Sequence, residues 1–185
     1  MGAALALCPD LIDRCVAGDR RAWSELHRLY RPQALAFLRR LGVGAREAED
    51  ACQEVFLQVF RYLGRFERRS DFRTWLYKLC ISQANRLRRR AVLLRPLAWL
   101  GGGAGSEAAF PQWSESRAVQ LAERALAALS PRQRAVFVLF EIEGLATGEI
   151  ARLLGAPGAS VRRQLQEARE RFERCVRDQP LEGKR

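Results

Sequence analysis

The chain has 185 residues, of which 48% are hydrophobic, and it carries 32 Lys and Arg against 21 Asp and Glu, a formal net charge of +11 at pH 7. This apolar content is enough to build a core and excludes a disordered polymer. A protein this basic is expected to meet a polyanion, and nucleic acid is the commonest one. A solvated basic surface without such a partner is the alternative at this point.

The apolar runs and the cysteines exclude several other classes. No apolar run approaches the roughly 20 residues that a membrane span needs, and the first residues lack the basic stretch of a signal peptide. We therefore expect no membrane insertion and a cytoplasmic location. The five cysteines are scattered and His27 is the only histidine, so we expect no metal and no cofactor. The cysteines are interpreted as small apolar helix residues.

Helical periodicity runs through both ends of the chain, without convincing period-two alternation. The middle stretch is rich in Gly and Pro, which is typical of a linker, although its two tryptophans suggest that it docks on something. The sequence therefore predicts an all-α protein with two small helical domains joined by a linker. The predicted domains are 1–90 and 119–178, with the linker at 91–118 and a tail at 179–185.

Glycines and capping residues set the bounds of the predicted helices. In the first domain the expected helices are 9–17, 19–41, 45–63 and 71–90. In the second domain they are 131–143, a short helix between Thr147 and Gly155, and 157–176. The predicted N-caps are Ser70, Ser130 and Thr147.

The predicted helix 45–63 has two contrasting faces. Its apolar residues recur at three- or four-residue steps and predict a buried stripe. The stripe consists of Ala48, Cys52, Val55, Val59 and Leu63, with Phe56 and Phe60 beside it. Another face carries Glu47, Asp50, Gln53, Glu54, Leu57 and Arg61. An acidic face is unexpected if the only partner of a basic protein is nucleic acid, but on spacing alone an ordinary solvated face is the favoured interpretation.

The segment from Arg65 to Arg90 interleaves basic and aromatic residues. Single-stranded DNA needs this combination, because cations neutralise phosphates while rings take unstacked bases. The alternative for the aromatics is the core, since Phe72, Trp75 and the leucines after them share helical spacing. The cluster of four arginines between residues 86 and 90 is the better candidate for DNA.

The last domain holds a helix-turn-helix pattern between residues 147 and 169. The first helix should turn Ile150, Ala151 and Leu154 inward, and Val161 and Leu165 should anchor the second helix. Gly155 suits a positive φ in the turn. The residues left to meet a major groove are Ser160, Arg162, Arg163, Gln164 and Arg169.

These motifs together resemble the extracytoplasmic-function sigma factors of bacterial RNA polymerase. The segments that resemble region two of that family are 17–23 (AGDRRAW), 29–32 (LYRP), 48–56 (AEDACQEVF) and 72–77 (FRTWLY). The segments that resemble region four are 129–134 (LSPRQR), 149–151 (EIA) and 160–161 (SV). The resemblance covers about 10–90 and 119–176, and its motifs are specific in combination.

The resemblance implies a protein without catalytic chemistry that binds core RNA polymerase (the beta-prime clamp and the beta flap), promoter DNA and an anti-sigma factor. The implied polymerase contacts are Asp50, Gln53, Glu54, Phe56 and Leu57. The implied −10 contacts, which open DNA and hold a flipped base, are Arg65, Phe66, Arg68, Arg69, Arg73, Lys78, Arg86, Arg88 and Arg89. The helix-turn-helix residues given above would bind the −35 element, and the linker would run toward the RNA exit path.

Some residues depart from the family pattern. Ser82 stands where an asparagine is frequent, and Gln164 and Glu167 stand where basic residues are common. The promoter preference of a relative therefore does not transfer. The first rival is a helix-turn-helix regulator that binds an operator without entering polymerase, and the second is an enzyme acting on nucleic acid. The acidic face of the helix 45–63 favours the sigma factor, because a simple repressor has no use for it.

Overall fold

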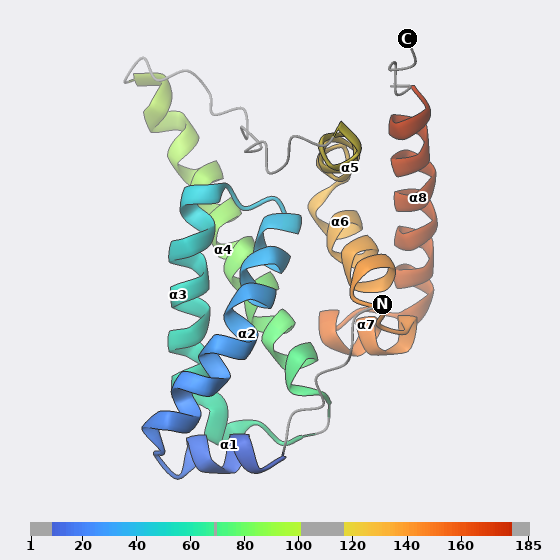
Figure 1. Cartoon of the computed structure of the whole chain (residues 1–185). Helices are drawn as coiled ribbons and strands as arrows, with labels where there is room; N and C mark the ends of the chain where they lie inside the picture. The colour runs from blue at the N-terminus through green and yellow to red at the C-terminus, as the bar shows by residue number, and fades with distance from the viewer. Residues whose placement is uncertain (1–8, 69, 101–116, 179–185) are drawn as a thin grey trace.

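The computed structural model describes residues 9–68, 70–100 and 117–178, and every element within them is helical (Figure 1). The first four helices are α1 (Pro9–Val16), α2 (Arg20–Arg40), α3 (Ala45–Tyr62) and α4 (Phe72–Leu100), with a short 3-10 helix η1 (Leu63–Arg65) before α4. The remaining elements are α5 (Arg117–Ala127), α6 (Pro131–Phe137), the π-helical η2 (Val138–Ile142), α7 (Thr147–Leu154) and α8 (Gly158–Arg177). The all-α prediction is confirmed. None of the described helices is long and apolar enough to cross a membrane.

The first helical unit packs α2, α3 and α4 side by side, with α1 across one end (Figure 1). The predicted stripe of α3 is buried along its whole length, from Ala48 to Leu63. Cys15, Cys52 and Cys80 are buried among apolar residues, as the sequence indicated, and this burial raises the pKa of the Cys15 thiol to about 11. These thiols are therefore part of the packing.

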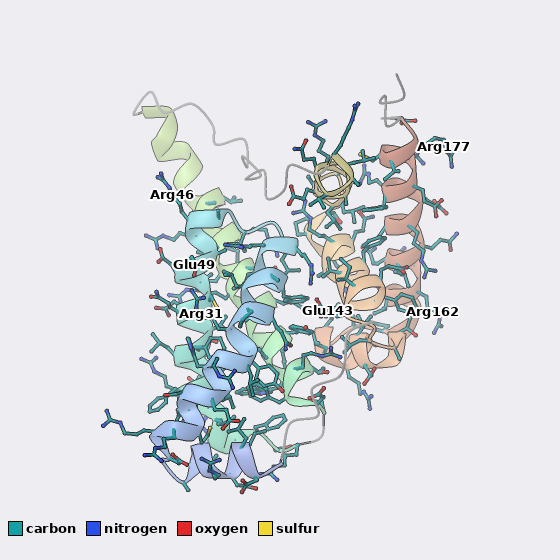
Figure 2. All side chains as sticks on the ribbon, viewed as in Figure 1. Arg31, Arg46, Glu49, Glu143, Arg162 and Arg177 are labelled. Carbon is teal, nitrogen blue, oxygen red and sulfur yellow. The ribbon has the colours of Figure 1, made fainter. Side chains whose placement is uncertain are left out.

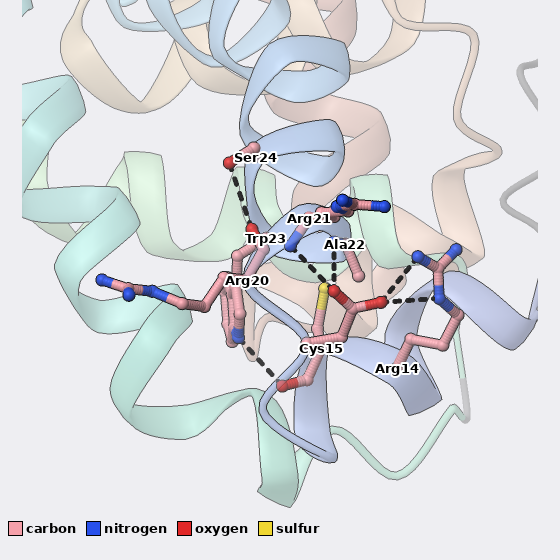
Figure 3. Close-up of polar contacts among 8 residues, drawn as sticks. Arg14, Cys15, Arg20, Arg21, Ala22, Trp23 and Ser24 are labelled. Carbon is pink, nitrogen blue, oxygen red and sulfur yellow. Dashed lines mark hydrogen bonds and ion pairs between the residues drawn. The ribbon is translucent and has the colours of Figure 1, made fainter.

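The corner between α1 and α2 is held by polar contacts (Figure 3). The Oδ1 atom of Asp19 accepts hydrogen bonds from the backbone N–H groups of Arg21 (2.8 Å) and Ala22 (3.3 Å), which caps α2. Its Oδ2 atom pairs with Arg14 at 2.6 Å. The hydrogen bond from Arg14 and those from the backbone lower the pKa of Asp19. The Trp23 indole N–H donates to the carbonyl of Cys15 at 2.9 Å, which fixes the ring at the edge of α2.

One apolar residue of α3 lies outside the core. Phe60 was predicted beside the buried stripe, but 65% of it is exposed. Successive helix residues turn by about 100°, so Phe60 points away from its buried neighbour Val59. Its ring packs against Trp23 at 4.9 Å between centroids.

Two of the predicted caps were wrong and one is confirmed. Asp71 rather than Ser70 precedes α4 and accepts from the Arg73 N–H at 3.3 Å. The α7 helix begins at Thr147 itself, and the N–H of Ala146 donates to the Glu149 side chain at 2.9 Å. In α6, Ser130 and Gln133 form a reciprocal capping box, as the Ser-Pro start indicated.

The second helical unit packs α8 against α5, α6 and α7. Its core contains Leu139, Ile150, Val161 and Leu165, and the turn between α7 and α8 has Gly155 at φ +60°. These residues confirm the predicted helix-turn-helix. The sequence did not anticipate the start of α5 at residue 117, nor the continuation of α4 through residues 91–100.

Candidate binding surfaces

A groove of about 630 Å³ lies between α2 and α3. It is lined by Arg20, Trp23, Ser24, His27, Gln53, Phe56, Leu57 and Phe60. Its floor and walls are largely apolar, because Trp23 packs on Phe60 and the His27 ring meets Phe56 edge-on at 4.7 Å. Leu57 is 50% exposed. Large apolar side chains gathered at one exposed site mark a binding surface.

The five residues expected to contact polymerase share one exposed side of α3. Gln53, Phe56 and Leu57 line the groove, while Asp50 and Glu54 are exposed on the same helix. Sequence reasoning missed the lining residues Trp23 and His27, which come from α2. Their four-residue spacing matches that of Phe56 and Phe60 on α3, and this was the available signal.

The only histidine contributes an uncharged wall to the groove. Partial burial, and secondarily the nearby Arg31 cation, lower the pKa of His27. The imidazole is therefore neutral at pH 7. Basic residues of α2 outside the groove pair with Glu49 of α3. Arg31 lies 2.5 Å from Glu49 (Figure 2), and Arg39 lies 3.5 Å from it.

The loop before α4 and the first turns of α4 form an aromatic cluster. Phe66 packs against Phe72 at 5.9 Å and against Trp75 at 5.4 Å between ring centroids. Trp75 and Phe66 are partly exposed, whereas Phe72 is buried. The cluster thus presents two partly exposed rings to solvent, and the buried Phe72 anchors it to the core.

The basic residues predicted for −10 DNA fall into two groups. Lys78, Arg86 and Arg89 are exposed along α4, and Arg73 is partly exposed near its start. Others already have contacts within the protein. Arg65 lies over the Tyr62 ring at 5.5 Å and Arg68 pairs with Asp13. Arg88 is turned inward, where it donates to the Leu41 carbonyl at 3.2 Å and to Asn85 at 2.6 Å, and burial lowers its pKa. The remaining member, Arg69, lies outside the described residues.

The residues predicted for −35 DNA all belong to α8, and they differ in exposure. Arg162 is exposed on the outer side of the molecule (Figure 2), and the Arg163 side chain is 70% exposed. Ser160 and Gln164 are half-buried beside them. Arg169 is engaged within the protein, since its Nε donates to Glu141 at 2.6 Å and its guanidinium lies 5.0 Å from the Phe140 centroid.

Residues 26–92 match the family described as Sigma-70 region 2, and residues 120–172 match Sigma-70, region 4. The chain is 31% identical over 186 residues to the RNA polymerase sigma-H factor of Pseudomonas aeruginosa, covering 92% of this chain and 93% of the relative. It is 30% identical over 171 residues to the ECF RNA polymerase sigma factor SigM of Mycobacterium tuberculosis, covering 90% and 83%. The chain belongs to the extracytoplasmic-function sigma factors. It directs promoter-specific initiation by RNA polymerase. The alternative function, a regulator that binds an operator without entering polymerase, is therefore rejected.

Solved structures share the fold of this sigma factor. The sigma factor RpoE of Bartonella quintana, in complex with the anti-sigma factor NepR, has a TM-score of 0.69 at 22% identity, over 85% of this chain and 98% of that chain. CnrH, in complex with the cytosolic domain of CnrY, has a TM-score of 0.65 at 22% identity, over 92% and 97%. The sigma family consists of initiation factors that bind core polymerase and promoter DNA.

Proposed function

We propose that the groove between α2 and α3 is the site where this sigma factor holds the beta-prime clamp of core polymerase. Its exposed aromatic and aliphatic side chains are the kind of anchors that carry interface energy once a partner excludes water from them. This exposed apolar groove, on the helix whose motif resembles the polymerase-binding region of the family, is the observation that supports the proposal most strongly.

The acidic residues beside the groove give the interface its charge. Asp50 and Glu54 are exposed on α3, next to the lining residues Gln53 and Leu57. A partner surface with cations at matching positions would associate faster and in a fixed register, because charge complementarity contributes more to on-rate and specificity than to affinity. Polymerase binding would therefore explain why this basic protein carries an acidic face, which DNA binding does not explain.

The DNA contacts are proposed from exposure. Lys78, Arg86 and Arg89 would neutralise phosphates of the opened −10 strand, and the rings of Phe66 and Trp75 would meet an unstacked base. In α8 the exposed pair of arginines would enter the major groove of the −35 element, with Ser160 and Gln164 beside them. We propose the domains 1–90 and 119–178, joined by 91–118, with a tail at 179–185.

Regulation and location complete the proposal. Both solved relatives are held by an anti-sigma factor or by the cytosolic domain of another protein, and we propose that an anti-sigma factor also binds this chain. Since a sigma factor acts on promoter DNA together with polymerase, we place it in the cytoplasm. The proposed mechanism is binding alone, without a covalent step.

A charge reversal on α3 tests the polymerase site. Glu54→Lys should weaken binding to core polymerase, measured by fluorescence anisotropy of labelled factor, while circular dichroism stays unchanged because Glu54 is exposed. Glu25→Lys is the matched control, since Glu25 is an exposed acid on the side of α2 away from the groove. Equal affinity for Glu54→Lys and the wild type would refute the proposed interface.

A further inference from the structure

A single carboxylate connects the two sigma domains. Glu143 follows η2 in region 4, and its side chain is only 9% exposed. Two groups of region 2 donate to it: the Tyr77 hydroxyl of α4, and Nη1 of Arg40 at the end of α2, at 2.9 Å. Figure 2 shows Glu143 at the junction of the two helical units.

A second set of contacts lies next to this carboxylate. Arg134 of α6 is 8% exposed, and its guanidinium lies against the turn after α2, where a Cβ on Gly42 would collide with Arg134 Nη1. Gly42 has φ +87°, so both its conformation and the close approach require glycine. Arg88 of region 2 donates to Leu41 in the same turn. Cations from both domains therefore meet the carbonyl end of α2, where the helix dipole favours them.

This contact is of a kind that can open. The side-chain contacts given above are polar or charged, and polar contacts between domains allow relative motion. Burying an ion pair costs desolvation that offsets much of its attraction, so this pair holds the domains together by only a modest free energy. Burial and the neighbouring Arg88 cation lower the pKa of Arg134 to about 10, which reflects a cation that water would solvate better once the domains part.

The closed arrangement is incompatible with the proposed DNA contacts. A compact chain of this length has a radius of gyration of about 16 Å, whereas the centres of the −10 and −35 elements are separated by about 25 base pairs, or about 85 Å of duplex. The two domains must therefore separate before both elements can be bound.

We propose that Glu143, held by Tyr77 and Arg40, is the latch of an autoinhibited closed state in which region 4 docks on region 2. Promoter engagement requires release of this latch. The inference rests on the proposed DNA surfaces of the two domains. It assigns a regulatory role to a residue outside both the polymerase groove and the DNA-contacting helices.

The test follows domain separation in the full-length free factor by single-molecule fluorescence transfer. Dyes are placed at Arg61 in α3 and Arg171 in α8, both exposed, through unnatural ketone side chains. The wild type should be mainly closed. Glu143→Gln should raise the open-to-closed ratio at least about tenfold, the equivalent of about 1.4 kcal/mol. Glu141→Gln is the matched control, because Glu141 pairs with Arg169 inside region 4.

A second variant tests the latch from the other domain. Tyr77→Phe removes one donor and keeps the ring stacked on Phe37, whose centroid is 4.2 Å away, and it should raise the open ratio at least about threefold. Circular dichroism verifies that each variant folds. A wild type that is already open, an unchanged ratio in Glu143→Gln, or an equal rise in Glu141→Gln would overturn the latch.

Transcription separates failure of the latch from failure of the proposed function. Wild type and Glu143→Gln should both give promoter-dependent run-off transcripts with core polymerase. Intact run-off together with an unchanged transfer ratio would overturn the latch and leave the promoter contacts standing. Absence of run-off from the wild type would instead contradict the promoter function, whatever the transfer ratio.

Discussion

Replacing Phe60 with alanine should weaken the binding of core polymerase more than it weakens the fold. The residue is 65% exposed at the groove. An aromatic side chain buries about 150–250 Å² when covered, so about 130 Å² of Phe60 remains for a partner to cover. At about 25 cal/mol per Å² this area gives an upper limit of about 3 kcal/mol. Because a partner covers only part of it, we expect a loss of about 1–2 kcal/mol, or 5- to 30-fold in Kd.

The cost to folding comes from the covered third of the side chain and its contact with Trp23. That area, about 70 Å², corresponds to less than about 2 kcal/mol, and a domain has about 5–15 kcal/mol of stability. The variant should therefore stay folded at 25 °C with a lower Tm. Kd for core polymerase is measured by anisotropy, with urea unfolding in parallel.

The matched control is Tyr62→Ala. Tyr62 is an aromatic residue of the same helix, 43% exposed, and it does not line the groove. It should leave the affinity for polymerase unchanged. Wild-type affinity in Phe60→Ala, or equal losses in Phe60→Ala and Tyr62→Ala, would refute the assignment of the groove.

Three other predictions concern the DNA surfaces and the fold. Arg162 and Arg163 point about 100° apart on α8, so their alanine variants should differ when binding to a library of −35 sequences is measured. One variant should lose sequence preference at a single position, by about 1–3 kcal/mol, and the other should lose affinity for all sequences alike, with a shallower salt dependence. Uniform losses in both variants would rule out direct readout of bases by this pair. Arg89→Ala should slow promoter opening, followed by a fluorescent base analogue, more than Arg88→Ala, because Arg88 faces inward; the reverse order would show that Arg88 reaches the strand. The pKa of Asp19 is lowered in the folded protein, so its carboxylate contributes fully to the free energy of unfolding above the pKa of the unfolded chain, and this contribution is lost as pH falls through the pKa of the folded protein. Asp19→Asn should remove this contribution. Urea unfolding at several pH values should therefore show the acid-dependent loss of stability in the wild type and not in the variant.

Much of the local structure follows from the sequence, because helix periodicity and capping depend on neighbours within a few turns. The stripe from Ala48 to Leu63 and the anchors Val161 and Leu165 are buried as their spacing predicts. Gly155 takes the positive φ expected in the helix-turn-helix. These features needed no knowledge of which helices pack together.

The contacts that sequence reasoning missed join distant segments. Trp23 and His27 complete the groove from α2, while its other aromatic residues come from α3. Glu143 meets Tyr77 across 66 residues and Arg40 across 103. Periodicity cannot reveal such pairs, because it describes which face of a helix is apolar and not which helix covers it. The exposure of Phe60 could not be predicted for the same reason.

Transcription initiation in a purified system shows whether this protein acts as a sigma factor. Core polymerase from the source organism is incubated with fragmented genomic DNA of that organism, with and without this protein, and the 5′ ends of the transcripts are sequenced. With the protein present, we expect transcript starts that share sequence elements near −10 and −35, and we expect a variant carrying both Arg162→Ala and Arg163→Ala to lose those starts. The same scattered starts with and without the protein would contradict this expectation.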